Sequence, residues 1–253
     1  MPYVGGPVAG CRGNKTGCGG FHRVLRSPGR HRLVIKGPAR APFSIERMTR
    51  ADLMGALLAF IARLITGAQG HWKGCPPKAE QRIYFANHQS HLDWVLIWAA
   101  LPRELRAVTR PIAARDYWTS SKLKHWITRE IFNAVYVSRT RKDDEDPLEP
   151  LVQALGGGDS LVIFPEGTRS NKGEPQPFKS GLFHLAEQFP QVQLIPAWID
   201  NVQRVMPKGE VVPVPVLCTV TFGTPMQIEP GEDKRTFLER ARDAVIELRP
   251  GKA

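Results

Sequence analysis

Hydrophobic positions near the start of the structured part of this chain follow a helical period. Between residues 53 and 68, large apolar residues recur at a spacing of three or four, as they do on one face of a helix. These residues are Leu53, Leu57, Phe60, Ile61, Leu64 and Ile65. The pattern predicts an N-terminal amphipathic helix that begins near Asp52.

From about Gln81 onwards, short apolar runs alternate with stretches of helical period. Strands are predicted at residues 82–86, 134–137, 160–164, 192–199 and 216–222, and helices near 92–100, 115–130, 147–155, 179–188 and 232–248. Such alternation is typical of a sheet whose faces are covered by helices. We therefore expect an α/β fold with a mixed, largely parallel sheet flanked by helices, and with functional loops at the strand ends.

The helix predicted near 147–155 has favourable residues at both ends. Asp146 can act as its N-cap, Pro147 occupies the first helical position, and Glu149 follows three residues after the cap. Gly156 lies where the helix should stop. We expect this element to start at Pro147.

The helix over 53–68 has two possible settings. It is interrupted by Arg63 and is too short to span a hydrocarbon layer of about 30 Å. It can lie in a membrane interface, or it can be buried against the rest of the protein. We divide the chain into a basic arm (1–46), this helix with its flanks (47–70) and the predicted α/β domain (71–253).

The positive charge of the chain is concentrated in the arm. The net charge is +11, and residues 1–50 contribute +9 of it through ten Lys and Arg and a single Glu. The arm is rich in Gly, Pro and Arg, so we expect it to be poorly ordered, and it has no apolar stretch that resembles a secretory signal. It can attract nucleic acid or anionic lipid, or it can be a solvated arm without a partner.

The four cysteines are Cys11, Cys18, Cys75 and Cys218. They show neither the paired spacing of metal ligands nor the density of a disulfide scaffold. Reduced thiols in a cytosolic compartment are the simplest interpretation.

The stretch FANHQSHLD places titratable groups where a predicted strand enters a predicted helix. His88 and Asp93 would lie about 140° apart on a continuous helix, so they can meet only if the chain turns between them. An imidazole whose other nitrogen faces a carboxylate is a general base. A structural His–Asp pair is the alternative. His88 and His91 could form half of a metal site, but no third ligand follows at a suitable spacing.

Two further strands are predicted to end on charged loops. SLVIFPEGTRS delivers Glu166, Gly167, Thr168 and Arg169 into a loop, and NAVYVSRTR ends a strand on Arg139. Glycine permits close backbone approach, and an arginine can bind a phosphate or a carboxylate with two hydrogen bonds. Ion pairs of these arginines with Glu166 or Glu130 are the structural alternative.

The motifs NHQSHLD and FPEGTRS, about 75 residues apart, together resemble those of the glycerolipid acyltransferases of the 1-acylglycerol-3-phosphate acyltransferase (PlsC-like) family. The resemblance covers roughly residues 70–225. It implies a glycerolipid acyltransferase-like α/β fold. It also implies the following roles: His88 as the catalytic base, Asp93 as its partner, and Arg139, Glu166, Gly167, Thr168, Arg169 and Lys179 as substrate-binding residues.

The resemblance further implies the reaction. His88 would deprotonate the free hydroxyl of a lysophospholipid, most simply 1-acylglycerol-3-phosphate, which then attacks the thioester of acyl-CoA or an acyl-carrier protein. No metal, cofactor or enzyme nucleophile is needed, and Ser90 and Thr168 are interpreted as loop hydrogen-bonding residues. The implied partners are the two substrates and a membrane surface rather than nucleic acid. The implied location is the cytoplasmic face of a membrane, with peripheral or interfacial attachment.

The sequence departs from the family pattern in its second motif. An Asp usually precedes the arginine there, whereas this chain has Ser138 before Arg139. This departure bears more on which lysolipid is the acyl acceptor than on the acyl transfer reaction itself. Three alternatives stay open at this point: an acyltransferase for another lysolipid, a membrane-binding module without catalysis, and a hydrolase that uses the same base on water.

Overall fold

The computed structural model describes residues 53–57, 60, 69–90, 93–137, 146–170, 173–200 and 218–251. The predicted arm (1–46) and most of the predicted helix over 53–68 lie outside the described residues. Within that helix, residues 53–57 and Phe60 are helical. No helix in the described part of the chain is long and apolar enough to cross a membrane.

The described strands form one seven-stranded sheet in the order β1-β7-β6-β2-β5-β3-β4. The strands are β1 (Gln69–Trp72), β2 (Arg82–Ala86), β3 (Thr109–Ala114), β4 (Val135–Val137), β5 (Ser160–Ile163), β6 (Gln193–Asp200) and β7 (Thr219–Phe222). Neighbours from β6 to β4 pair in parallel, β7 pairs antiparallel with β6, and β1 pairs parallel with β7. The α/β fold with a mostly parallel sheet is thereby confirmed.

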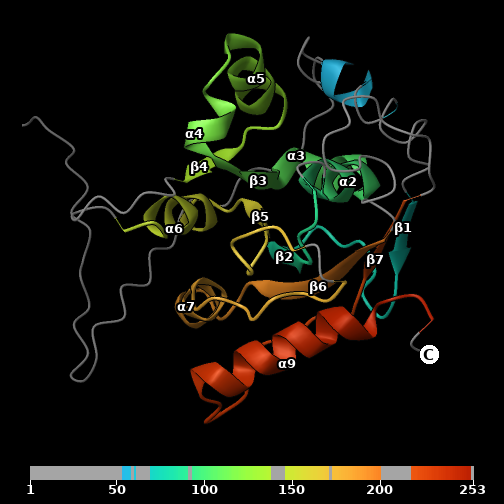
Figure 1. The fold of residues 1–253 in the computed structure, drawn as a ribbon, viewed down its shortest axis with the longest axis vertical. Coiled ribbons are helices and arrows are strands. Elements are labelled where there is room, and N and C mark those ends of the chain that lie inside the picture. Colours follow the sequence, from blue (N-terminus) through green and yellow to red (C-terminus); the bar gives the residue numbers. More distant parts are fainter. Residues whose placement is uncertain are drawn as a thin grey trace, which may run out of the picture. The chain divides into compact units, whose positions relative to one another are not determined.

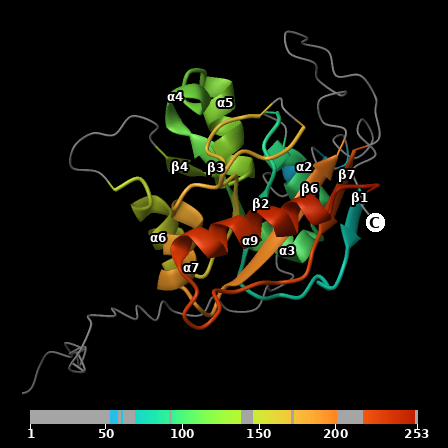
Figure 2. The same cartoon turned by 60° about the horizontal axis from the view of Figure 1, so that its bottom comes forward.

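Helices cover both faces of this sheet. They are α2 (Asp93–Ala100), α3 (Arg103–Val108), α4 (Arg115–Trp118), α5 (Lys122–Trp126), the π-helix η1 (Ile127–Ile131), α6 (Glu149–Gly156), α7 (Gly181–Gln188) and α9 (Lys234–Glu247). Figure 1 shows α2, α3 and α5 on one side of the sheet, and α7 and α9 on the other. In the turned view of Figure 2, α9 passes in front of the central strands.

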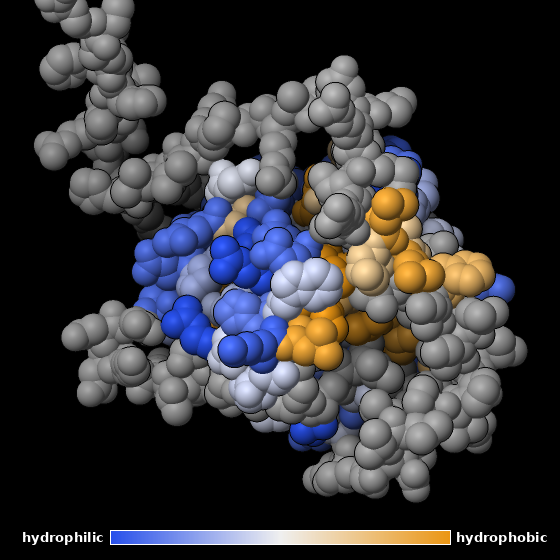
Figure 3. Space-filling model, turned by 90° about the horizontal axis from the view of Figure 1, so that it is seen from above, coloured by the Kyte–Doolittle hydropathy of each residue, from blue (hydrophilic) through white to orange (hydrophobic). Residues whose placement is uncertain are grey.

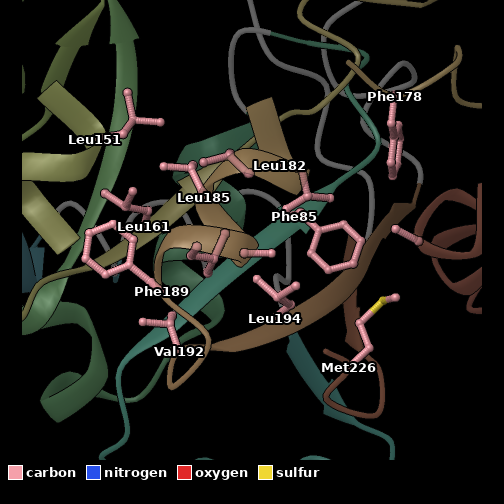
Figure 4. Close-up of a cluster of buried hydrophobic side chains, with 14 of the residues drawn as sticks. Phe85, Leu151, Leu161, Phe178, Leu182, Leu185, Phe189, Val192, Leu194 and Met226 are labelled. Carbon is pink, nitrogen blue, oxygen red and sulfur yellow. The ribbon is translucent and has the colours of Figure 1, made fainter. Parts of the chain in front are cut away.

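Alternate residues of the central strands pack into two separate hydrophobic cores, one on each face of the sheet. In β2, Tyr84 and Ala86 pack with α2 on one face, whereas Ile83 and Phe85 pack with α6, α7 and α9 on the other. Figure 4 shows Phe85 and Leu194 of the strands against Leu182 and Leu185 of α7. All of β2 is buried, as expected for a central parallel strand.

Two strands were not predicted from the sequence. β1 (QGHW) is an edge strand with one large apolar residue, and β3 (TRPIAA) contains Pro111. Because proline has no N–H to donate to a neighbouring strand, its presence in a sequence argues against a central strand. Pro111 nevertheless pairs in register with Val162 of β5. Burial alternates strictly along β3, so its inward residues hold it in the sheet.

Two predicted helices differ in their bounds. The helix expected over 115–130 is divided into α4, α5 and η1, and the Thr119 hydroxyl donates to the Arg115 carbonyl where α4 ends. The helix expected to start at Pro147 begins at Glu149. The Asp146 carboxylate accepts from the amide of Leu148 at 2.9 Å and so caps a turn that precedes the helix. Gly158, with φ +86°, follows the helix end, whereas Gly156 lies inside it.

Candidate active site

The site begins where β2 leaves the sheet. The β2–β6 ladder ends at Ala86 paired with Ala197. Beyond it, the buried side chain of Asn87 donates to the carbonyl of Ile199 at 3.0 Å and accepts from the amide of Ile199 at 2.8 Å. The carboxamide thus replaces one step of main-chain pairing. The main chain of the next residue is thereby released from the sheet, and His88 lies immediately beyond its edge.

His88 and Asp93 are in direct contact. Nδ1 of His88 lies 2.8 Å from Oδ2 of Asp93, and this oxygen also accepts the amides of Gln89 at 2.6 Å and Ser90 at 2.8 Å. The chain therefore turns around the carboxylate, which is fully buried at the first residue of α2. A negative charge is favoured at a helix N-terminus.

The contact with Asp93 defines the state of the imidazole. A carboxylate at Nδ1 favours the tautomer that carries its proton there, which leaves the lone pair on Nε2. The side chain of His88 is 18% exposed, whereas that of Asp93 is 1% exposed. The geometry therefore provides an accessible base with a buried, fixed partner.

The loop after β5 holds His88 from the other side. Oε1 of Glu166 accepts the main-chain amide of His88 at 2.7 Å, and the amide of Ser170 donates to the His88 carbonyl at 2.8 Å. The ring of Phe164 stacks on the imidazole, with centroids 4.3 Å apart and planes 17° apart. The backbone and the ring of His88 are both fixed by this loop.

Glu166 itself is buried, and within the described residues its carboxylate forms no ion pair with a lysine or an arginine. Its Oε2 accepts the amide of Gln176 at 2.7 Å, so each carboxylate oxygen is bonded to a main-chain N–H. Burial raises the pKa of Glu166, while these amides and the nearby His88 act to lower it. The ion pair between Glu166 and an arginine, considered from the sequence, is not formed in the described part of the chain, and Glu130 pairs with Arg129 at 3.4 Å.

Gly167 and Lys179 lie against each other. Gly167 has φ +68°, and a Cβ added to it would come within 2.5 Å of Nζ and 2.8 Å of Cε of Lys179. The amide of Lys179 donates to the carbonyl of Pro165 at 2.9 Å. The backbone conformation favours glycine at this position, and the absence of a side chain lets the end of Lys179 lie against the main chain. The lysine brings a cationic group to the loop.

The remaining predicted site residues are placed differently. Thr168 and Arg169 are exposed on the same loop, between Glu166 and Ser170, which both contact His88. Arg139 and His91 lie outside the described residues. The structure brings His88, Asp93, Glu166, Gly167 and Lys179 together, and their individual roles stay predictions.

Sequence reasoning missed the residues that hold the site. Asn87, Phe164, Ser170 and Gln176 were not assigned to it, although each contacts His88, Glu166 or the strand end. The position of Asn87 between a buried strand and the histidine was an available signal. Main-chain donors such as those of Ser170 and Gln176 leave no signal in a sequence.

Comparisons with known proteins identify the family and the fold of this chain. The family model described as Acyltransferase matches residues 75–200. The chain is 35% identical to mouse 1-acyl-sn-glycerol-3-phosphate acyltransferase alpha over 61% of this chain and 53% of the mouse protein. It is 36% identical to the human protein of the same name over 53% and 46%. This chain thus spans about half the length of these mammalian relatives.

More distant relatives match over a larger share of the chain. A coconut 1-acyl-sn-glycerol-3-phosphate acyltransferase is 25% identical over 77% of this chain and 61% of its own length. The crystal structure of the 1-acyl-sn-glycerophosphate (LPA) acyltransferase PlsC from Thermotoga maritima superposes with a TM-score of 0.59, at 23% identity and 78% coverage of both chains, which establishes the shared fold. Through residues 75–200, which carry the His88–Asp93 pair and the loop from Phe164 to Ser170, the chain belongs to the acyltransferase family.

Proposed function

We propose that this protein transfers a fatty acyl group from acyl-CoA or an acyl-carrier protein to the free hydroxyl of 1-acylglycerol-3-phosphate, giving phosphatidic acid. The observation that carries the proposal is the contact of 2.8 Å between Nδ1 of His88 and Oδ2 of Asp93 at an accessible strand end. The relatives named as 1-acyl-sn-glycerol-3-phosphate acyltransferases support the choice of acceptor.

The reaction requires one base and no covalent enzyme intermediate. Nε2 of His88 takes the hydroxyl proton as the acceptor oxygen forms a bond to the thioester carbonyl carbon. Collapse of the tetrahedral intermediate breaks the C–S bond, and the departing thiolate receives the proton from the imidazolium. Asp93 holds the ring in the required tautomer and stabilises the imidazolium while it exists.

Cationic groups beside the base suit a phosphate on the acceptor. Lys179 crosses Gly167, and Arg169 is exposed on the same loop. An arginine can bind a phosphomonoester with two hydrogen bonds, and a lysine contributes a point charge. We assign both residues to the acceptor phosphate, together with Arg139, which follows β4 in the chain.

We further propose that the protein attaches peripherally to the cytoplasmic face of a membrane. Among the described residues, the exposed large hydrophobic ones belong to the 53–60 segment and to α5: Leu53, Met54, Leu57, Phe60, Leu123 and Trp126. Gly55 lies near Trp98 of α2 and Ile131 of η1, and η1 directly follows α5 in the chain. Figure 3 shows hydrophobic residues gathered on one part of this face beside a hydrophilic part. The free thiols of Cys75 and Cys218 are compatible with a reducing compartment.

Product analysis tests the transfer reaction. Purified protein is incubated with radiolabelled acyl-CoA, with and without 1-acylglycerol-3-phosphate, and the lipids are separated. We expect labelled phosphatidic acid that depends on the acceptor. Release of free fatty acid at the same rate without acceptor would identify a hydrolase, and binding without turnover would leave only a lipid-binding module.

Vesicle flotation tests the membrane surface. Leu123 and Trp126 are 64% and 47% exposed on α5, and the neighbouring Arg129 is also exposed, a combination that suits anionic lipid. Replacing both Leu123 and Trp126 by Glu should reduce flotation with anionic vesicles by about tenfold, because each loses apolar burial worth more than 1 kcal/mol. The control is His184→Glu on α7, across the sheet. Equal flotation of all three proteins would remove this surface from the proposal.

A further inference from the structure

Glu166 lies in the motif that the family resemblance assigns to acceptor binding, yet its side chain does not face solvent. The residue is 2% exposed, and both carboxylate oxygens already accept main-chain amides, from His88 and from Gln176, each at 2.7 Å. A phosphate on an acceptor would also be repelled by a carboxylate. Neither its position nor its charge suits a ligand of an anionic lipid head group.

Because no cation of the described residues pairs with Glu166, its buried carboxylate must be stabilised in another way. Burying such a charge is unfavourable unless hydrogen bonds compensate, and burial raises the pKa of Glu166. A carboxylate can accept at both oxygens, whereas the amide of a glutamine accepts at one and donates at the other. Both donors that meet Glu166 are main-chain N–H groups, which require acceptors. The geometry therefore favours a carboxylate over a glutamine.

The contacts of Glu166 converge on the base. The Phe164–Ser170 loop binds His88 at its amide through Glu166, at its carbonyl through Ser170 and at its ring through Phe164. Asp93 supplies the fourth contact, at Nδ1. Because Glu166 also bonds to Gln176, it ties the segment that carries the base to the segment that leads to Lys179.

We propose that Glu166 is a positioning residue that acts through His88 and is not an acceptor ligand. It fixes the main-chain position from which the imidazole projects, and it contributes a negative charge beside the imidazole. His88 and Asp93 are the titratable side chains of the described residues that act electrostatically on it. The inference rests on the proposed transfer reaction, because it assigns Glu166 to the base of that reaction.

The first test separates kcat from the acceptor KM. In Glu166→Gln, one main-chain donor loses its acceptor, so His88 should shift and kcat should fall by about 10- to 100-fold, the range expected for one hydrogen bond to a charged group. The acceptor KM should change less than about threefold. The control is Glu174→Gln, an exposed glutamate in the segment before Gln176, which should retain wild-type values. A large rise in acceptor KM with unchanged kcat would overturn the proposal.

The second test observes His88 without any substrate. Nitrogen-15 NMR of the histidine rings, with the His88 signal assigned by its loss in His88→Ala, reports the Nδ1–H bond to Asp93. In Glu166→Gln this signal should move, while it should stay in place in Glu174→Gln. An unmoved signal in folded Glu166→Gln would show that Glu166 does not act through His88.

Two safeguards keep these outcomes distinct. If Glu166→Gln does not fold, Glu166→Asp keeps the charge but shortens the side chain by one methylene, and the same pattern of lower kcat with little change in KM is expected. If the wild-type protein makes no phosphatidic acid, the proposed function fails, whereas the NMR comparison still decides whether Glu166 positions His88.

Discussion

Glu166, in the loop after β5, and Glu232, just before α9, are two glutamates with nearly buried side chains and different partners. Glu166 is 2% exposed and is held by the main-chain amides of His88 and Gln176. The side chain of Glu232 is 6% exposed and accepts from Nε and Nη2 of Arg240 at 2.7 and 2.6 Å. One carboxylate is held by neutral donors, the other by a guanidinium.

The two environments move the two pKa values in opposite directions. The hydrogen bond from Arg240 is the main cause that lowers the pKa of Glu232, whereas burial is the main cause that raises the pKa of Glu166. An ion pair of the first kind contributes to stability at neutral pH. A charge of the second kind costs stability, as is common beside functional sites, and this supports the positioning role proposed above for Glu166.

The largest expected effect comes from removing the base itself. His88→Ala should lower turnover by at least about 100-fold, because general base catalysis contributes about 10² to 10⁴. Asp93→Asn should also be severely impaired, since Asn does not select the same tautomer. Thermal melting should show a folded His88→Ala protein, and exposed His184→Ala should remain fully active. Retention of more than about a tenth of wild-type turnover by His88→Ala would exclude it as the base.

A smaller effect is expected on stability at Glu232. Its folded pKa is lowered, so the Glu232–Arg240 pair stabilises the protein at neutral pH, and this contribution is lost as pH falls through the folded pKa. Glu232→Gln should lower Tm at neutral pH by about 2–4 °C, roughly 1 kcal/mol, and the difference from wild type should close at acidic pH. A Tm difference that does not depend on pH would assign the loss to packing instead.

The smallest expected pH dependence of stability, and one of opposite sign to that at Glu232, concerns Glu166. The pKa of Glu166 is raised in the folded protein. Its contribution to the free energy of unfolding is therefore fully present at low pH, where the carboxyl group is protonated in the folded and the unfolded protein, and it is lost as pH rises through the folded pKa. The Tm of wild type minus that of Glu166→Gln should therefore decrease from acidic to neutral pH. Melting curves measured across this pH range give the slope of the Tm difference against pH. If this slope had the same sign for Glu166→Gln as for Glu232→Gln, the contrast between the two glutamates would be wrong.

The sheet could be predicted largely because its central strands are apolar. Runs such as RIYFA and SLVIF indicate buried strands, and β2 and β5 occupy these positions. β1 and β3 were missed because an edge strand needs few apolar residues and because Pro111 argues against a strand. The shift of the start of α6 arises because Asp146 caps a turn, and a sequence does not distinguish the two kinds of cap.

The site could be predicted less completely. The meeting of His88 with Asp93 follows from the motif, because a strand that enters a helix must turn between them. The contacts of Glu166 could not be predicted, since both of its donors are backbone groups that every residue except proline possesses. The roles of Arg139, Thr168, Arg169 and Lys179 stay predictions.

The order of residues along the Phe164–Ser170 loop separates two tasks. Phe164, Glu166 and Ser170 contact His88, whereas Thr168 and Arg169 between them are exposed. We therefore expect the loop to be modular, so that the head group it accepts can be altered by replacing its exposed residues while the chemistry is left intact. A library confined to Thr168 and Arg169 would search for new acceptors on an unchanged catalytic base.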